Sequence, residues 1–542
     1  MKKMKKYIIT SVLALSTIFV AQAQGSKSTI YPTVLEINQV KATWFNSNNA
    51  AGMILTPLSD FGTLSVGYDM KIGAYRQQQE GDLKTLDINT SGSSPLGRAR
   101  VWGEFTYQNI TQENTKFNTL RLTLDPDMPY ILADSRLSYF KKQVYDMTMK
   151  AATPLLWDLV AFGVTANYFT KSGAKQIDPR CDSYEYGIEV KPSTVFAFGD
   201  HSAGLTFMYK NAFDRYSPLN SNSQQDQPAF NLRGVGSYVD AVVGSFGGLG
   251  TYYYKTNKLG GALQYGYQGS NVKVLAEGNY TYQVIDVFHT PAKPRRMGST
   301  IQHVIGGNLQ MVLEGDSFTN KVTLDGYRRS TDGIEYIQVI DATYEVQQWV
   351  SIAKFIRSKY DFTGISLKYD LFRDSREGYD WMAGIQGQYT DRLDTYILPE
   401  SSFKAENVYG EIYGKKNFMA GNASIVAGLS AGYNFNIAGE HIYNGPFPDS
   451  EVVRDLYEKD LAILSANYYQ FGVNLKAIFP LGEKSTIYVA ASCKYLRSNE
   501  ELHNYSYGTD TEGKNFWWNL NPGPQLTPSA RTFANFSIGF TF

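Results

Sequence analysis

The chain has 542 residues, with 51 basic and 51 acidic side chains, 14% aromatic residues and a mean hydropathy of −0.31. This hydropathy excludes a bundle of membrane-spanning helices, because no stretch after the first 23 residues has 18 consecutive apolar residues. The even charge balance, without a concentrated basic segment, argues against nucleic acid as a partner.

The first 23 residues have the three parts of a secretory signal peptide. Four lysines within 2–6 precede an apolar stretch at 7–20, and small residues follow at positions 21 and 23. We expect cleavage between Ala23 and Gln24 and export by the general secretion route, which would leave 47 basic and 51 acidic side chains. An uncleaved anchor is the alternative, but the apolar stretch is shorter than the about 20 residues that a membrane span needs.

Residues alternate between apolar and polar over many segments of the remaining chain. The segment 64–74 is apolar at every even position and small or charged between. The segment 272–284 repeats the pattern with Leu275 as the exception, and so do 365–371, 473–479 and 489–495. Such alternation is typical of strands that face lipid on one side and a polar lumen on the other.

Short and long connections alternate along most of the chain, as in barrels with short periplasmic turns and long extracellular loops. The predicted short turns are 91–95, 269–271, 416–422 and 480–484, and the predicted long polar loops are 112–135, 211–249, 438–461 and 499–529. The order fails between 321 and 360, so we assign part of that region to an extracellular hairpin. The expected fold class is all-β, a transmembrane antiparallel barrel of about 18 strands, within a range of roughly 14 to 20.

The last strand has an apolar face that ends on an aromatic residue. Phe536, Ile538, Phe540 and Phe542 share this face with Ala534, and polar or small residues alternate with them. The pattern resembles the C-terminal signal read by the outer-membrane barrel assembly machinery. That resemblance implies an outer-membrane location, with membrane lipid and this machinery as partners.

The expected domains are a signal peptide at 1–23, an N-terminal segment at 24–60 and a single barrel at 61–542. Residues 42–53 read ATWFNSNNAAGM. They resemble the Asn-Pro-Ala-Gly-Leu hatch of FadL-type hydrophobic-compound transporters, although Asn49-Ala50 stands where that family has Asn-Pro. The segment is far shorter than the plug domain of TonB-dependent transporters. We expect it to form a hatch in the lumen, because a wide barrel leaves room for one.

The overall plan also resembles an uncharacterised family of outer-membrane barrels from Bacteroidota. In that family a signal peptide, a short segment containing Ser-Asn-Asn-Ala-Ala-Gly and one barrel make up the chain. The resemblance implies the location and the fold, and it assigns no functional residue.

The predicted strand registers place charged side chains of both signs on the lumen face. The candidates are Asp69, Lys71, Lys273, Glu277, Lys368, Asp370, Glu411, Lys415, Lys476 and Lys494. They indicate either a polar channel with a transverse field or wall residues that are paired or solvated. Charge alone does not identify a solute, since selectivity also depends on pore width and on the loops.

One predicted outer loop carries adjacent aromatic residues, Phe516, Trp517 and Trp518. Exposed aromatic rings can stack on a sugar or dock a partner protein. The alternatives are a loop that folds back on itself and an aromatic pair at the membrane girdle.

Catalysis is not expected. The histidine best placed for it is His289, which lies near Asp286 in the sequence and could serve an outer-membrane hydrolase. A single His near an Asp is more often structural, and the sequence has neither metal-ligand spacing nor a phosphate-binding glycine motif in its usual context. We therefore expect neither an enzyme nor a cofactor.

Two hypotheses follow from the sequence. The first is a channel or import component for a nutrient. The second is a non-transporting surface protein whose loops bind a glycan or a partner protein, such as a lipoprotein or another transporter. An outer-membrane hydrolase is a remote third.

Overall fold

The computed structural model describes residues 31–73, 76–79, 81–222, 224–245, 250–343, 347–482, 485–498, 505–507 and 530–542. The predicted cleavage site at Ala23 and Gln24 lies outside the described residues. So do the loop aromatics Phe516, Trp517 and Trp518.

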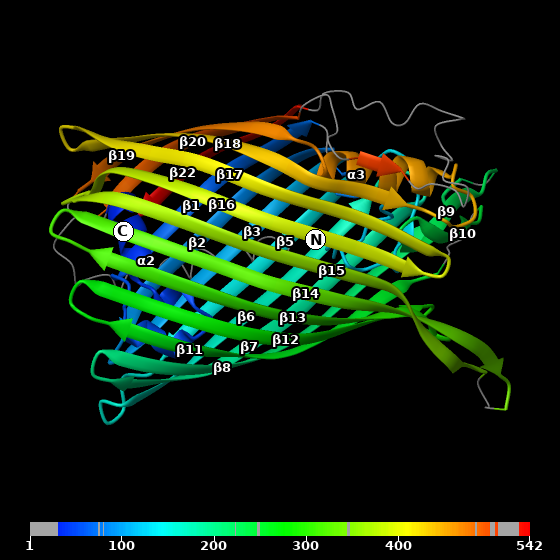
Figure 1. Ribbon diagram of the computed structural model, residues 1–542, viewed down its shortest axis with the longest axis horizontal. Coiled ribbons are helices and arrows are strands. Elements are labelled where there is room, and N and C mark those ends of the chain that lie inside the picture. Colours follow the sequence, from blue (N-terminus) through cyan, green and yellow to red (C-terminus); the bar gives the residue numbers. More distant parts are fainter. Residues whose placement is uncertain are drawn as a thin grey trace, which may run out of the picture.

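The described part of the chain contains eighteen antiparallel strands that form one closed sheet (Figure 1), which confirms the predicted fold class and strand number. The strands of this barrel are β1 (Phe61–Gly73), β2 (Asp82–Leu96), β3 (Ala99–Thr115), β5 (Ser138–Ala152), β6 (Val160–Lys175), β7 (Arg180–Phe198), β8 (His201–Leu219), β11 (Tyr252–Gln268), β12 (Val272–His289), β13 (Arg295–Glu314), β14 (Phe318–Asp341), β15 (Gln348–Ser375), β16 (Gly378–Ile397), β17 (Glu400–Ala420), β18 (Ala423–Ile442), β19 (Tyr468–Leu481), β20 (Ser485–Ser498) and β22 (Ala530–Thr541). Each strand pairs with its neighbours in chain order, and β22 pairs with β1 to close the barrel.

The last residue completes this closure. The backbone N–H of Phe542 donates to the carbonyl of Gly62 at 2.9 Å, and its carbonyl accepts from the N–H of Gly62 at 2.8 Å. A Cβ at Gly62 would lie 2.3 Å from the Phe542 ring, so only glycine leaves room for the ring there. The predicted assembly stripe thus lies along the strand that joins the end of the barrel to its beginning.

The two ends of the barrel differ. At one end, here called the turn end, β2–β3, β7–β8 and β17–β18 are joined by two-residue turns in which Gly97, Gly199 and Gly421 take positive φ angles of 61–62°. A Cβ added at any of these three glycines would have no atom within 4 Å, so their turns project into open space. The other end, here called the loop end, carries the long connections at 116–137, 220–251 and 443–467.

β14 and β15 continue beyond the rest of the barrel at the loop end as a two-stranded hairpin (Figure 1). Its register pairs Ile334 with Ile356 and Ile340 with Trp349. The sequence-based assignment of this region to a hairpin is therefore consistent with the structure, and it explains why β15 reaches 28 residues.

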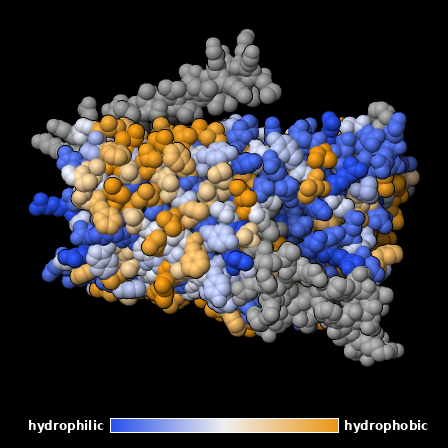
Figure 2. Space-filling model, turned by 90° about the horizontal axis from the view of Figure 1, so that it is seen from above, coloured by the Kyte–Doolittle hydropathy of each residue, from blue (hydrophilic) through white to orange (hydrophobic). Residues whose placement is uncertain are grey.

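The outside of the barrel carries an apolar belt near the turn end, whereas the loop end is hydrophilic (Figure 2). Leu64, Val66, Leu367, Val473 and Ile538 contribute to the exposed apolar surface, each with more than a third of its area accessible. An outward apolar face on a closed barrel is that of a membrane-spanning protein. None of the helices in the described ranges has the length and hydropathy needed to span a membrane.

Short elements supplement the barrel. Near the turn end lie α2 (Pro32–Lys41), η1 (Trp44–Asn46) and η2 (Ala50–Ile54). Near the loop end lie a small sheet of β4 (Leu132–Ala133), β9 (Gln227–Gly234) and β10 (Ser237–Val243), and the helical pair η3 (Val452–Glu458) and α3 (Lys459–Leu464). A short strand, β21 (Tyr505–Tyr507), pairs parallel to β18.

Candidate functional site in the barrel lumen

The described part of the N-terminal segment, residues 31–60, packs against the inner wall near the turn end. Trp44 is only 2% exposed, and it fits there because two wall positions are glycine. A Cβ at Gly266 would lie 2.8 Å from its Nε1 atom, and one at Gly204 would lie 3.1 Å from its Cη2 atom. At Gly163 a Cβ would lie 2.3 Å from the backbone nitrogen of Ala51. The wall is thus shaped to admit this segment.

Leu275, the exception to the alternation in β12, faces inward for the same reason. It is fully buried in a cluster with Trp44, Ala51, Ala161 and Val195. An apolar residue on the lumen side of β12 therefore finds an apolar partner on the N-terminal segment.

Polar contacts also hold the segment to the wall. The backbone N–H of Asn48 donates to Glu277 Oε2 at 3.0 Å, and its side-chain amide donates to Oε1 at 2.5 Å. Lys191 Nζ lies 3.3 Å from Asn48 Oδ1, and Lys150 Nζ donates to the Phe45 carbonyl at 2.7 Å. Glu36 accepts from Lys415 Nζ at 2.6 Å. All the wall residues in these contacts lie on the same face of the sheet, the one that faces the lumen.

The strand registers place all ten predicted lumen residues on that side. Glu277 and Lys415 contact the N-terminal segment. The others pair with wall residues: Lys273 with Glu314 at 2.5 Å, Lys368 with Asp370 at 3.1 Å, Lys494 with Glu411 at 3.7 Å, Asp69 with Asn535 at 2.7 Å, Lys476 over the Tyr488 ring at 4.3 Å and Lys71 over the Phe533 ring at 5.9 Å. The ten therefore do not converge on one centre.

Three of the ten line a cavity of about 420 Å³ on the wall formed by β18, β19, β20, β22 and β1 to β3. Asp69, Lys71 and Lys494 contribute its charges. Gln108 and Asn474 add amide groups, and the larger part of the lining is apolar, with Leu83, Ile110 and Phe533 among its residues. This part of the lumen can hold a small solute that has both polar and apolar groups.

A second segment enters the lumen from the loop end. Residues 116–137, here called the inward loop, bury Phe117, Leu120 and Leu132 completely or nearly so. Leu120 and Leu132 lie in one core with Tyr216 of β8 and Tyr254 of β11. The long loop predicted at 112–135 is present at 116–137, but it folds into the lumen and buries apolar residues instead of forming a polar outer loop. Its apolar residues, among them Leu120, Leu122 and Leu124, are the signal that could have shown an inward fold.

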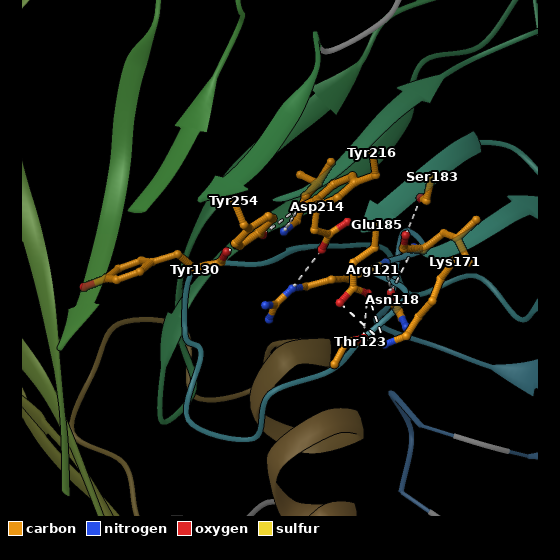
Figure 3. A network of polar contacts seen from close by, with 12 residues as sticks. Asn118, Arg121, Thr123, Tyr130, Lys171, Ser183, Glu185, Asp214, Tyr216 and Tyr254 are labelled. Carbon is orange, nitrogen blue, oxygen red and sulfur yellow. Dashed lines mark hydrogen bonds and ion pairs between the residues drawn. The ribbon is translucent and has the colours of Figure 1, made fainter. Parts of the chain in front are cut away.

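Among the polar contacts of the inward loop, the Arg121 side chain points toward Asp214 of β8 (Figure 3). Its Nε atom lies 3.5 Å from Asp214 Oδ2, and its guanidinium lies 4.4 Å above the Tyr254 ring. The Tyr254 hydroxyl donates to the Tyr130 carbonyl at 2.7 Å, and the Tyr216 hydroxyl accepts from the Leu132 N–H at 3.1 Å. Burial by itself lowers the pKa of Arg121, but nearby groups, Tyr254 and Asp214 above all, raise this pKa by more, so the guanidinium keeps its charge.

Two further buried charges fix the inward loop. Asp134 accepts from Lys175 Nζ at 2.5 Å, with both side chains almost fully buried. Asp127 accepts from Arg329 Nη2 at 3.1 Å and from the Thr331 hydroxyl at 3.2 Å, and Arg392 lies 3.5 Å away. The loop is therefore joined to opposite parts of the barrel wall.

The helical pair η3–α3 packs beside the inward loop. Leu456 joins Phe117 in one buried cluster, and Asp460 forms an ion pair with Arg76 at 2.8 Å. Burial raises the pKa of the Glu458 carboxyl to about 7, against the partial opposing effect of Arg454. This part of the loop end therefore has a group that titrates near neutral pH.

His289 and Asp286 lie on opposite faces of β12. His289 pairs with Tyr252, whose ring it contacts at 4.6 Å on the lumen side, whereas Asp286 pairs with outward-facing Lys255. The Asp286 carboxylate accepts from the Ser299 hydroxyl at 2.5 Å. The two residues cannot form a dyad, and in the described ranges no group of three or more His, Cys, Asp or Glu is placed to hold a metal.

Comparison with known families places the chain. A model of DUF6850, a family of unknown function, matches residues 50–542, which include the end of the N-terminal segment and the whole barrel. The chain belongs to the DUF6850 family. A search of curated proteins finds no match.

Three solved structures are similar to this DUF6850 barrel at low sequence identity. The ferric yersiniabactin uptake receptor FyuA from Yersinia pestis is 7% identical, with 89% of this chain and 80% of that chain covered and a TM-score of 0.41. The ferric preacinetobactin receptor BauA from Acinetobacter baumannii is 9% identical, with 89% and 80% covered and a TM-score of 0.35. The monoaromatic hydrocarbon channel CymD is 11% identical, with 95% and 97% covered and a TM-score of 0.31. At these scores the likenesses carry no argument about function.

Proposed function

We propose that this protein is a gated import channel of the bacterial outer membrane, specific for a nutrient that enters through the barrel lumen. The observation that carries the proposal is that two separate segments occupy the lumen, the N-terminal segment near the turn end and the inward loop near the loop end. A barrel that served only as an anchor would need neither.

Outer-membrane barrels have short periplasmic turns and long outer loops, so the turn end is assigned to the periplasm. The N-terminal segment then acts as a periplasmic hatch and the inward loop as an outer lid. A solute would pass the lid, reach the wall between the two, and leave when the hatch moves.

The contacts of the two closures suit different tasks. The hatch is held by the apolar cluster around Trp44, by hydrogen bonds from Asn48 and Asn49 to wall residues, and by the ion pairs Lys41–Asp374 and Lys415–Glu36. The side chains of these ion pairs are about a quarter to a third accessible, so water can replace them at little cost. The lid is held by an apolar core and by the buried ion pairs of Arg121 and Asp134, which are costly to break. The hatch is therefore expected to open more readily.

Liposome swelling tests the proposal. Purified full chain should admit small sugars and amino acids slowly, and a variant that lacks 31–58 and has a shortened inward loop should admit them faster. A chain that lacks the paired hairpin residues 338–340 and 349–351, which extend beyond the rest of the barrel, is the matched control and should behave as the full chain does. Equal, negligible swelling for all three chains would contradict the channel.

One observation favours a second candidate function, a surface protein that binds a partner. The hairpin beyond the barrel exposes apolar side chains at the loop end, with Ile352 62% and Phe355 48% accessible. Outward-facing Arg328 and Asp332 separate them from the lipid-facing part of β14. Exposed apolar surface outside the membrane is typical of a protein contact.

Site-specific photo-crosslinking in native membranes tests this second function. A crosslinker at Ile352 should give a discrete protein adduct, and one at lipid-facing Leu429 should not. If neither position gives an adduct, the hairpin has no stable partner.

A further inference from the structure

Two lysines face each other on the wall between the hatch and the lid. Lys210 of β8 and Lys258 of β11 are direct cross-strand partners on the lumen side. Like charges placed directly opposite each other destabilise a sheet unless something compensates them. Their position therefore needs an explanation in chemical terms.

Both lysines lie between the two closures on their own strands. On β8, Gly204 lies against Trp44 and Asn49 of the hatch, and Asp214 contacts Arg121 of the lid, with Lys210 between them. On β11, Gln264 contacts Asn49 and Tyr254 contacts the Tyr130 carbonyl, with Lys258 between. Neither closure covers this stretch of wall, and both side chains are partly accessible.

The carboxylates of this stretch are already engaged. Glu185 accepts from Thr123 at 2.6 Å and pairs with Lys171 at 3.4 Å, while Asp214 pairs with Arg121. Glu277 accepts from Asn48 and from Gln264. Glu189 of β7 is the direct cross-strand neighbour of Lys210, but its carboxylate forms an ion pair with Lys191 at 3.5 Å.

Among the residues that the structure describes, Lys258 has neither an ion pair nor a hydrogen bond. Lys210 lies 5.1 Å from the centre of the Phe169 ring, and no carboxylate of the described residues lies within ion-pair distance of it. Lys191 and Lys150 add further positive charge toward the hatch, where they hold Asn48 and Phe45. The wall between the closures thus carries an excess of positive charge.

We propose that Lys210 and Lys258 form a binding site for a small free anion that carries a carboxylate, phosphate or sulfate group. The two ammonium groups donate charge-assisted hydrogen bonds to it, which removes the repulsion between them. As a statement about the imported solute, this rests on the function proposed above. The lumen position excludes a lipid headgroup, since the outward faces of β8 and β11 alone meet lipid.

Calorimetric titration of the full chain in detergent at low ionic strength tests the site, with inorganic sulfate, inorganic phosphate and succinate as probes. At least one probe should bind in a saturable way. Binding should weaken about tenfold or more in Lys210→Gln/Lys258→Gln, because two charge-assisted hydrogen bonds are lost. Lys210→Arg/Lys258→Arg should retain it. Binding of succinate alone indicates a site for carboxylates, and binding of sulfate or phosphate alone indicates a site for tetrahedral oxyanions.

The matched control is Lys255→Gln/Lys416→Gln, which removes the same net charge from outward positions of β11 and β17. It should bind as the unmodified chain does. If none of the probes binds, or if the two Gln pairs weaken binding equally, the inference is overturned.

Swelling assays keep this inference separate from the channel function. Binding that is lost only with Lys210 and Lys258, in a protein that never conducts, supports the site and contradicts import. Conduction without any such binding supports import and contradicts the site.

Discussion

Asp134 joins the inward loop to the barrel wall, and its replacement by Asn should release the loop. Its carboxylate accepts from Lys175 Nζ at 2.5 Å and from the Thr119 hydroxyl at 3.2 Å, and both charged side chains are almost fully buried. Asn keeps the shape but leaves the Lys175 charge uncompensated. Removal of one partner from a buried pair costs about 3–5 kcal/mol. The equilibrium constant for docking of the loop should therefore fall by roughly two to three and a half orders of magnitude.

Hydrogen exchange followed by mass spectrometry measures this directly, because exchange in 116–137 reports the opening of the loop. Asp134→Asn should exchange faster there, while strands near the turn end should be unchanged. Asp240→Asn, an exposed acid on β10, is the matched control and should leave exchange as it is.

The paired variant Asp134→Leu/Lys175→Met should regain much of the protection, because an apolar pair of similar volume can replace a buried ion pair. Loop protection that stays unchanged in Asp134→Asn would refute the reasoning, since the loop would then be held without this pair.

Three further predictions concern other parts of the molecule. Because burial raises the pKa of Glu458 from 4.5 to about 7, the folded state holds a proton that the unfolded state releases in this range. The helical pair should therefore lose roughly 3 kcal/mol of local stability between pH 4.5 and 7 and no more above it, and Glu458→Gln should abolish this dependence, as followed by hydrogen exchange. Gly163→Val should undock the hatch at a cost of about 1–3 kcal/mol, seen as faster exchange in the N-terminal segment, whereas Gly278→Val, with open space around it, should not. Phe542→Ala should lower the yield of heat-modifiable folded barrel on gels more than Phe479→Ala does, because the Phe542 ring packs against Gly62 where β22 meets β1 to close the sheet.

The barrel could be predicted from the sequence because lipid and lumen impose a period of two on every strand. The pattern at 64–74 corresponds to β1, and the apolar stripe from Ala534 to Phe542 corresponds to β22. The turn predicted at 91–95 is wrong, since β2 continues to Leu96 and pairs with β3. Small and polar residues such as Ser91 to Ser94 fit a lumen-facing strand end as well as a turn.

The ion pairs that hold the inward loop, and the position of the proposed anion site, could not be predicted from local patterns. Arg121 depends on Asp214 and Tyr254, which lie about a hundred residues further along the chain, so no short motif contains the contact. Lys210 and Lys258 become neighbours only when β8 pairs with β11 across a long connection. The ten lumen charges could be predicted because alternate residues of a strand face the lumen. This alternation does not tell at what depth along the barrel axis each residue lies.

Planar-bilayer conductance of four chains tests the central claim, that two closures lie in series in one lumen. The chains are the full protein, one without 31–58, one with 116–137 replaced by a short flexible turn, and one with both changes. We expect low conductance for the first, at most small or intermittent openings for the two single variants, and a large steady conductance for the double variant. A full chain that conducts as well as the double variant, or a double variant that does not conduct, would contradict this claim.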